Sequence, residues 1–218
     1  MGEGVAGDGA VAVNCRRVWV LRRFGVICYR LLHPAILGGA LSDYRRVWNE
    51  GGTYFFTVNL IRRGGNDLLT RHIGLLRSVV ALVRQRHPFL IHAWVVLPEH
   101  LHCVIELPTG DAGFASRWRL IKAGFSKGLP VEEWRSAAQV KRGERGIWQR
   151  RYWEHLVRDE ADFRAHVDYV HINPVKHGLV GRVVDWPYST FHRLVAQGIY
   201  PADWAGSDAA GAMGYRDW

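Results

Sequence analysis

The sequence predicts an α+β fold of the ferredoxin-like, split βαβ type: an antiparallel sheet with helices on one face, followed by a further C-terminal helix. Segments rich in β-branched and aromatic residues alternate with segments whose apolar residues recur at helical spacing. Their order is strand, helix, strand, strand, helix, strand, helix, and the first six match the split βαβ arrangement. The chain has 218 residues, 48% of them hydrophobic, which suffices for one domain of this kind. The sheet face without helices can hold a nucleic acid.

The first half of this domain predicts three strands and one helix. Residues 53–60, Thr-Tyr-Phe-Phe-Thr-Val-Asn-Leu, have the composition of a strand. The next segment is predicted to be a helix, because its apolar residues recur at helical spacing: Ile73, Leu76, Val80 and Val83. The stop signal of this helix is His87-Pro88. Residues 91–97 and 100–107 are apolar runs on either side of Pro98-Glu99, and they predict a hairpin.

The second half predicts a helix, a loop, a strand and a final helix. Residues 114–127 are expected to be helical from the spacing of their apolar residues: Phe114, Trp118, Ile121 and Phe125. The polar, arginine-rich residues 127–146 predict a mobile loop, and residues 148–157 resume a strand pattern. Asp159 can cap a final helix that runs from the next residue to about Asn173-Pro174.

We expect one domain at residues 43–206, preceded by an extension and followed by a tail at residues 207–218. Residues 1–42 are first Gly/Ala-rich and then basic and apolar without a clear period, so this extension is expected to be poorly ordered. Its apolar stretch is interrupted by Arg22, Arg23 and Arg30 before it reaches the roughly 18 residues that a membrane span needs. The stretch also begins too far from Met1 for a usual signal peptide. We therefore expect a cytoplasmic protein.

The charge and aromatic content favour a nucleic acid as the partner. Lys and Arg outnumber Asp and Glu by 29 to 20, the formal charge is +9 and the sequence pI is about 9.9. The ten Trp add aromatic faces that can stack on unpaired bases, although each of them could instead fill the core. The three Cys lack C-x-x-C spacing, so neither a disulfide framework nor a zinc cluster is expected.

Two histidines lie two residues apart in the predicted strand at residues 100–107. Because alternate side chains of a strand point to the same face, His100 and His102 share one face while Leu101 and Cys103 share the other. Such a pair is a compact two-imidazole metal site. The alternative is a strand that carries two polar residues on its solvated face.

The final helix, from Glu160, carries a second candidate group. An apolar stripe can pack on the sheet: Phe163, Val167 and Val170. At spacings of three and four residues, His166, Tyr169 and Asn173 share another side of the helix. Tyr169 could thus be a nucleophile next to a metal ligand. The alternatives are a half-buried core tyrosine and, for Asn173, a helix C-cap before Pro174.

Several ordered motifs between residues 44 and 204 resemble the REP-associated tyrosine transposases. The segments that carry the resemblance are Leu97-Pro-Glu-His-Leu-His102, Trp148-Gln-Arg-Arg-Tyr-Trp-Glu-His155 and Asp168-Tyr-Val-His-Ile-Asn-Pro-Val-Lys-His-Gly-Leu-Val180, together with Gly51-Gly-Thr-Tyr-Phe-Phe-Thr57, Ala93-Trp-Val-Val-Leu97 and Asp185-Trp-Pro-Tyr-Ser-Thr-Phe-His192. The resemblance implies a single-tyrosine HUH endonuclease that acts on single-stranded or hairpin DNA of bacterial repetitive extragenic palindromes, the REP elements. The extension before Ser42 departs from the family pattern.

Carried over by position, the resemblance implies the roles of four residues. Tyr169 would be the nucleophile, and His100, His102 and Asn173 would hold a divalent ion, Mg²⁺ or Mn²⁺, with Mg²⁺ favoured by abundance. The implied reaction is DNA cleavage and rejoining through a 5′-phosphotyrosine link, without a nucleotide cofactor. The final helix would then be the catalytic helix.

Basic and aromatic residues near these motifs are candidates for DNA contacts. We expect contacts from Arg117, Arg119, Lys122, Arg150, Arg151, Trp148, Trp153 and Trp186, with Arg142 and Arg145 in the same basic cluster. The alternative for the cluster is a solvated loop. Two rival functions remain: a non-catalytic module that binds single-stranded nucleic acid, and a phosphodiesterase in which a metal-bound water attacks and Tyr169 is structural. The sequence leaves open whether the protein is a monomer or a homodimer.

Overall fold

The computed structural model describes residues 18–21, 26–29, 49–133 and 135–206. The chain divides into two compact units, residues 1–45 and 46–218. In the first unit, β1 (Val18–Leu21) pairs antiparallel with β2 (Val26–Tyr29), a pairing that the sequence did not predict. The rest of the predicted extension and the predicted tail at residues 207–218 lie outside the described residues.

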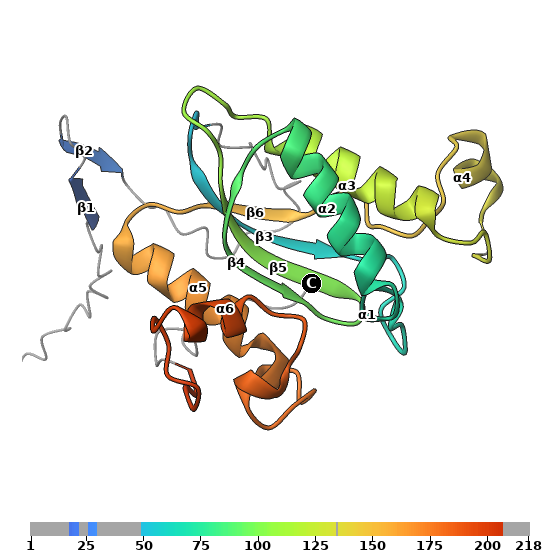
Figure 1. The fold of residues 1–218 in the computed structure, drawn as a ribbon. Coiled ribbons are helices and arrows are strands. Elements are labelled where there is room, and N and C mark those ends of the chain that lie inside the picture. Colours follow the sequence, from blue (N-terminus) through green and yellow to red (C-terminus); the bar gives the residue numbers. More distant parts are fainter. Residues whose placement is uncertain (1–17, 22–25, 30–48, 134, 207–218) are drawn as a thin grey trace, which may run out of the picture. The chain divides into compact units, whose positions relative to one another are not determined.

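The second unit contains the predicted antiparallel sheet. Its strands are β3 (Thr53–Asn59), β4 (Leu90–Val96), β5 (His100–Glu106) and β6 (Trp153–Leu156), in the spatial order β4-β5-β3-β6. All neighbours are antiparallel. This order is the one that two interleaved βαβ units produce, so the predicted ferredoxin-like fold is confirmed (Figure 1).

Three helices cover one face of this sheet: α1 (Leu68–Arg71), α2 (Ile73–Arg86) and α3 (Phe114–Gly128). The main core lies between them and the strands, because every second strand residue points to this side. Phe56 is buried there against Phe114 and Trp118, with ring centroids 5.4 and 5.3 Å apart. α2 ends just before Pro88, the predicted stop signal.

The opposite face of the sheet is covered by α5 (Glu160–Lys176), as Figure 1 shows. Phe55, Val95 and Val104 of the sheet form a second core with Val167 and Val170 of this helix. The expectation of a sheet face open to nucleic acid was therefore wrong. The apolar stripe of the helix needs an apolar surface to cover it, and this face of the sheet provides one.

Three predicted segments differ from the structure by more than one residue. Within the predicted loop at residues 127–146, α4 (Ala137–Lys141) forms because Ser136 and Gln139 make a capping box. β6 starts at Trp153 rather than Trp148, which makes only an isolated bridge to Leu60. α5 continues through Pro174 to Lys176, since the missing N–H removes one hydrogen bond near the helix end while later amides still bond.

A short C-terminal region completes the unit, with η1 (Val183–Asp185) and α6 (Phe191–Ala196). Thr190 ties this region to β4, because its hydroxyl accepts a hydrogen bond from the Trp94 amide at 2.8 Å. In the part of the chain that the structure describes, no helix has both the length and the apolar character that crossing a membrane requires.

Candidate active site

β5 carries His100 and His102 on the sheet face that α5 covers, as the alternation predicted. Leu101 and Cys103 point to the opposite core instead. The two imidazole rings lie edge to face with centroids 4.8 Å apart, and both side chains are almost fully buried, at 1% and 0% exposure. The alternative of two histidines on a solvated strand face is therefore wrong.

Each imidazole is oriented by a polar contact at its Nδ1 atom. Nδ1 of His102 is 2.8 Å from Oγ1 of Thr57, its cross-strand neighbour on β3, and Nδ1 of His100 is 3.2 Å from a carboxylate oxygen of Glu99. These contacts orient the rings and leave Nε2 as the ligand atom. Nε2 of His100 is buried and has no hydrogen-bond partner among the described residues. A buried acceptor of this kind fits a metal ion.

Burial also keeps His100 in the form that binds metals. Removal from solvent lowers the pKa of His100 below its ordinary value, and the hydrogen bond and charge of Glu99 offset this only in part. A neutral imidazole offers the lone pair that a metal ligand needs, whereas an imidazolium does not.

α5 places Tyr169 beside this pair. The Tyr169 ring packs edge-on against His102 and Phe55, with ring centroids 5.4 and 5.7 Å apart. It is fully buried rather than half-buried, at 0% exposure. The exposed side chain of Lys176 lies over it, with Nζ 4.7 Å from the ring centroid and 3.5 Å from the phenolic oxygen. A substrate reaches the Tyr169 hydroxyl only if covering groups such as this lysine move.

Asn173 is buried on the same helix, one turn after Tyr169. Its amide nitrogen donates a hydrogen bond to the Tyr169 carbonyl at 2.6 Å. The amide oxygen is buried without a hydrogen-bond partner in the described part of the chain. A buried acceptor of this kind fits the ligand of a cation. The C-cap of α5 is His177, so the alternative role of Asn173 as a C-cap is wrong.

His177 is a residue of this site that the sequence reasoning missed. Its ring centroid lies 5.0 Å from that of His100, and the ligand atoms of His100, His102 and His177 all lie within 4.8 Å of one another. The signal was present, because residues 169, 173 and 177 continue one helical stripe. Because the helix was predicted to end near Pro174, His177 was not included in that stripe.

Imidazole nitrogens and an amide oxygen are ligands that fit a divalent transition ion such as Mn²⁺. His100 and His102 lie on β5. Asn173 and His177 lie on α5 and its C-cap, and this helix packs directly on β5. The four side chains therefore converge without contributions from loops, and the donors fit the divalent ion that the motif pattern implied.

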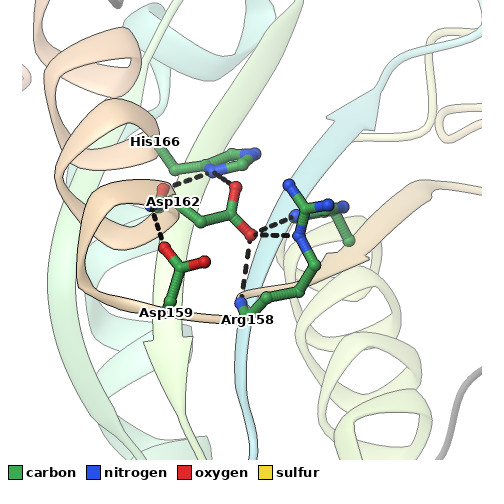
Figure 2. A network of polar contacts seen from close by, with 5 residues as sticks. Arg158, Asp159, Asp162 and His166 are labelled. Carbon is green, nitrogen blue, oxygen red and sulfur yellow. Dashed lines mark hydrogen bonds and ion pairs between the residues drawn. The ribbon is translucent and has the colours of Figure 1, made fainter. Parts of the chain in front are cut away.

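A carboxylate network fixes the start of α5 (Figure 2). The Asp162 carboxylate accepts hydrogen bonds from the backbone and guanidinium nitrogens of Arg158 at 3.0 and 2.9 Å, and it contacts His155 at 2.8 Å and His166 at 3.1 Å. Asp159 caps the helix by accepting from the Asp162 amide at 2.8 Å. These partners hold the pKa of Asp162 well below its usual range against its partial burial.

This network is a structural anchor rather than a second metal site. The ligand atoms of His155, Asp162 and His166 are close enough to share an ion, but the Arg158 guanidinium already occupies the carboxylate. The His166 ring also packs on Phe55, with centroids 4.9 Å apart, and Phe55 touches Tyr169. The anchor thus reaches the candidate nucleophile through one aromatic ring.

Four of the predicted DNA-contact residues line one basic groove. The groove has a volume of about 990 Å³ and lies along α3, α4 and the segment before β6. Of the predicted residues it contains Arg119, Lys122, Trp148 and Arg150, together with Arg142 and Arg145 of the basic cluster. The groove is lined by Lys127 and one acidic residue, Glu144, as well. Its cationic lining makes it a candidate surface for a phosphate backbone.

The structure gives two of the predicted arginines an internal role. Arg117 is buried, pairs with Asp111 at 2.6 Å and donates to the His87 and Pro88 carbonyls. Arg145 pairs with Glu133 and holds the pKa of that carboxyl at about 2. Both guanidinium groups tie the chain together. Arg117 is too buried to contact DNA, whereas Arg145 lines the groove but is already paired with Glu133.

The three predicted tryptophans have different surroundings. Trp148 lines the groove but is mostly buried in the core against Phe125, so little of its ring is accessible to a base. Trp186 donates its indole N–H to the Val96 carbonyl at 3.0 Å, and Trp153 packs edge-on against Phe55. Arg151 is exposed and lies outside the groove lining.

Individual relatives, rather than a family model, place the chain in a family. No family model matches the chain. The chain is 50% identical over 176 residues to the REP-associated tyrosine transposase of Escherichia coli K12, covering 81% of this chain and 98% of that protein. It is 45% identical over 169 residues to a putative REP-associated tyrosine transposase of Haemophilus influenzae, covering 77% and 95%.

A solved structure agrees with these relatives. It is described as a REP-associated tyrosine transposase bound to a REP hairpin, and it has 51% sequence identity and a TM-score of 0.66 to this chain. The match covers 77% of this chain and 93% of that one. With its antiparallel sheet, its pair of histidines and the helix that carries Tyr169, the chain belongs to the REP-associated tyrosine transposases.

Proposed function

We propose that this protein is a metal-dependent endonuclease and strand transferase for single-stranded DNA of REP hairpins, and that it acts through a 5′-phosphotyrosine intermediate with Tyr169 as nucleophile. The observation that carries the proposal is the contact between the Tyr169 ring and His102, with centroids 5.4 Å apart. It brings a nucleophile next to a pair of buried imidazoles. The solved relative's REP hairpin supports the choice of substrate.

In cleavage, the Tyr169 oxygen forms a bond to the scissile phosphorus and loses its proton. The bond from phosphorus to the 3′ oxygen breaks, and that oxygen leaves as a hydroxyl after it gains a proton. The products are a 5′-phosphotyrosine link and a free 3′ hydroxyl. A tyrosine hydroxyl has an ordinary pKa near 10, so it needs help with this attack at neutral pH.

His100, His102 and Asn173 would hold the divalent ion, Mg²⁺ or Mn²⁺. When bound, such an ion polarises the scissile phosphate and offsets the charge that develops on the leaving oxygen. Thr57 and Glu99 keep the two imidazoles in the orientation that directs Nε2 to the ion, through the contacts at Nδ1.

Lys176 assists the nucleophile in this proposal. Its ammonium lies 3.5 Å from the Tyr169 oxygen and its side chain is exposed at the surface. The cation can move with an incoming phosphate and still offset negative charge on the tyrosine oxygen. The same charge assists the reverse step, in which a 3′ hydroxyl attacks the phosphotyrosine and the Tyr169 oxygen leaves.

The basic groove would bind the DNA backbone away from the nucleophile. Arg119 and Arg150 are exposed in it, and Lys122 lies at its wall with Nζ 2.9 Å from the Gln149 carbonyl. Phosphate contacts of this kind set position and orientation, while bases are read elsewhere. A cytoplasmic location, at the bacterial nucleoid, follows from this substrate.

The proposal is tested with labelled DNA that contains a REP-type hairpin and flanking single strand, incubated with the protein and Mn²⁺ and run on a denaturing gel. We expect a cleaved strand that migrates with the protein, and none with EDTA or with fully duplex DNA. Cleavage without a protein-linked strand would support the water-attack phosphodiesterase instead. Binding without cleavage under all these conditions would support a non-catalytic binding module.

A further inference from the structure

The helix that carries Tyr169 ends at a histidine that faces the metal-binding pair. His177 is the C-cap of α5, and its amide donates a hydrogen bond to the Asn173 carbonyl at 2.9 Å. Its ring lies 65° from the plane of the His100 ring, with centroids 5.0 Å apart. The C-terminal end of α5 therefore fixes the backbone of His177 next to His100.

We propose that His177 is a third imidazole ligand of the ion held by His100 and His102, and that it makes the site select Mn²⁺ over Mg²⁺. The inference rests on the proposed function in one respect, namely that these histidines form the metal centre of the nuclease. It adds a ligand beyond Asn173, the third ligand that the motif pattern gave. It also decides between two ions that the pattern left open.

The distances support a shared ion. Ligand atoms bound to one ion at about 2.1 Å lie about 3 to 3.5 Å from one another. The ligand atoms of the three histidines already lie within 4.8 Å of one another. His100 and His102 are fixed by Glu99 and Thr57, whereas His177 is half-buried at a helix end and can close the remaining gap by side-chain rotation.

The donor set supports the selectivity. Mg²⁺ prefers oxygen ligands in octahedral geometry and keeps several waters, whereas Mn²⁺ accepts imidazole nitrogen readily. Two imidazoles and an amide oxygen leave the choice nearly open. With His177 the set has three nitrogens and the buried Asn173 oxygen, which disfavours Mg²⁺.

The test is calorimetric titration of the DNA-free full chain with Mn²⁺ and, separately, with Mg²⁺. The variants are His177→Ala and His177→Gln, and the latter keeps a polar side chain at the helix end if the alanine variant does not fold. His87→Ala is the matched control, because His87 is the exposed C-cap of α2. Visible absorption of bound Co²⁺ gives a second readout of the ligand set.

We expect both His177 variants to bind Mn²⁺ about tenfold more weakly or worse, with Mg²⁺ binding changed less than about threefold, so that the Mn²⁺ preference falls. The Co²⁺ spectrum should change as well, and His87→Ala should match the wild type. Unchanged Mn²⁺ affinity, or an equal loss for both ions, would overturn the inference. His100→Ala separates the two levels: if it binds Mn²⁺ as the wild type does, the metal centre of the proposed function itself fails.

Discussion

Lys176 places a cation next to Tyr169, the candidate nucleophile. The ammonium lies 3.5 Å from the phenolic oxygen and 4.7 Å from the ring centroid. A lysine here both shields the buried tyrosine and offers charge to its oxygen. The two effects predict opposite results when the lysine is removed, because loss of shielding would speed substrate access and loss of charge would slow the chemistry.

We predict that the charge effect dominates. Lys176→Gln should slow cleavage at saturating DNA by about tenfold, a modest loss because the ammonium is partly solvated, while Lys176→Arg should retain most activity. Lys141→Gln is the matched control, since Lys141 is also an exposed lysine in the last turn of a helix. Single-turnover rates on labelled hairpin DNA measure the effect. Faster cleavage by Lys176→Gln would show that the lysine acts mainly as a cover.

At this scale the sequence predicted what a repeating period can show. The shared face of His100 and His102 follows from strand alternation, and the closeness of Tyr169 and Asn173 follows from the helical turn. The internal bonding of Arg117 could not be predicted, because its partners lie 6 to 30 residues away in the chain. From sequence alone an arginine is expected to be an exposed cation, and only its neighbours in the folded structure show whether it is buried and paired.

Among the elements, α5 determines the position of the nucleophile relative to the sheet. Its first turn is held by the Asp162 network and its core side by Val167 and Val170. The carboxylate of Asp162 is mostly buried, with a side-chain exposure of 8%, so its removal takes an acceptor away from several donors at once.

We predict that Asp162→Ala destabilises the fold by about 2 kcal/mol, because the buried His166 and neighbouring donors lose this carboxylate as an acceptor. Glu160→Ala is the control from the same helical turn: its pair with Arg164 is exposed and should be worth less than about 0.5 kcal/mol. Urea unfolding measures both. Equal losses in the two variants would mean that the network does not anchor α5.

A second element-scale prediction concerns the basic groove. The double variant Arg119→Ala, Arg150→Ala should weaken DNA binding and lower the slope of log affinity against log salt by about two, one for each phosphate that is no longer neutralised. Arg182→Ala, which removes an exposed arginine paired with Asp185, is the control. Fluorescence anisotropy at several salt concentrations gives the slope. An unchanged slope in the double variant would remove the groove from the DNA path.

The element predictions failed where short local interactions outweigh composition. Residues 127–146 have the polar, arginine-rich composition of a loop, yet the capping box of Ser136 and Gln139 nucleates the short helix α4. The predicted strand at residues 148–157 begins late because its ladder with β3 stops at Trp153, opposite Thr57. Before this point the segment makes only the bridge from Trp148 to Leu60 and a hydrogen bond from the Gln149 amide to the Asn59 carbonyl. Register depends on the partner strand and cannot be derived from one segment alone.

At the scale of the whole unit of residues 46–218, α5 adds a third layer on the sheet face opposite α2 and α3 (Figure 1). The imidazoles of His100 and His102 are buried beneath it. The element order predicted the sheet correctly, since it allows few other topologies. The apolar stripe of the final helix predicted that this helix can pack on the sheet, as it does, but the period of a helix does not show which face of a sheet it covers. Another buried imidazole, that of His171 in α5, makes stability depend on pH.

We predict that acidification destabilises the fold through His171. Burial lowers the pKa of His171 to about 3, below the ordinary value of about 6.5 that it regains on unfolding. The unfolded chain therefore binds this proton first, so stability is complete above about pH 6.5 and falls as the pH drops toward 3. Between pH 7.5 and 5 the loss from this residue should be up to about 2 kcal/mol.

Urea unfolding at the two pH values, without metal, measures this loss. His171→Gln should reduce the difference between pH 7.5 and 5, whereas His192→Gln should not, since His192 is exposed. The burial of His100 acts in the same direction, so some dependence remains in the first variant. An undiminished dependence in His171→Gln would show that this imidazole is not responsible.

The central claim is that Tyr169 forms the covalent link to DNA. Its most direct measurement is mass spectrometry of the protein-DNA adduct after nuclease and protease digestion, with the wild type and Tyr169→Phe compared in Mn²⁺. The phenylalanine variant keeps the ring that packs against His102 and Phe55, so DNA affinity should stay within a few fold. We expect a nucleotide on the Tyr169 peptide of the wild type and no adduct in the variant. An adduct of equal yield in Tyr169→Phe, or a nucleotide on Tyr152 instead, would contradict the account.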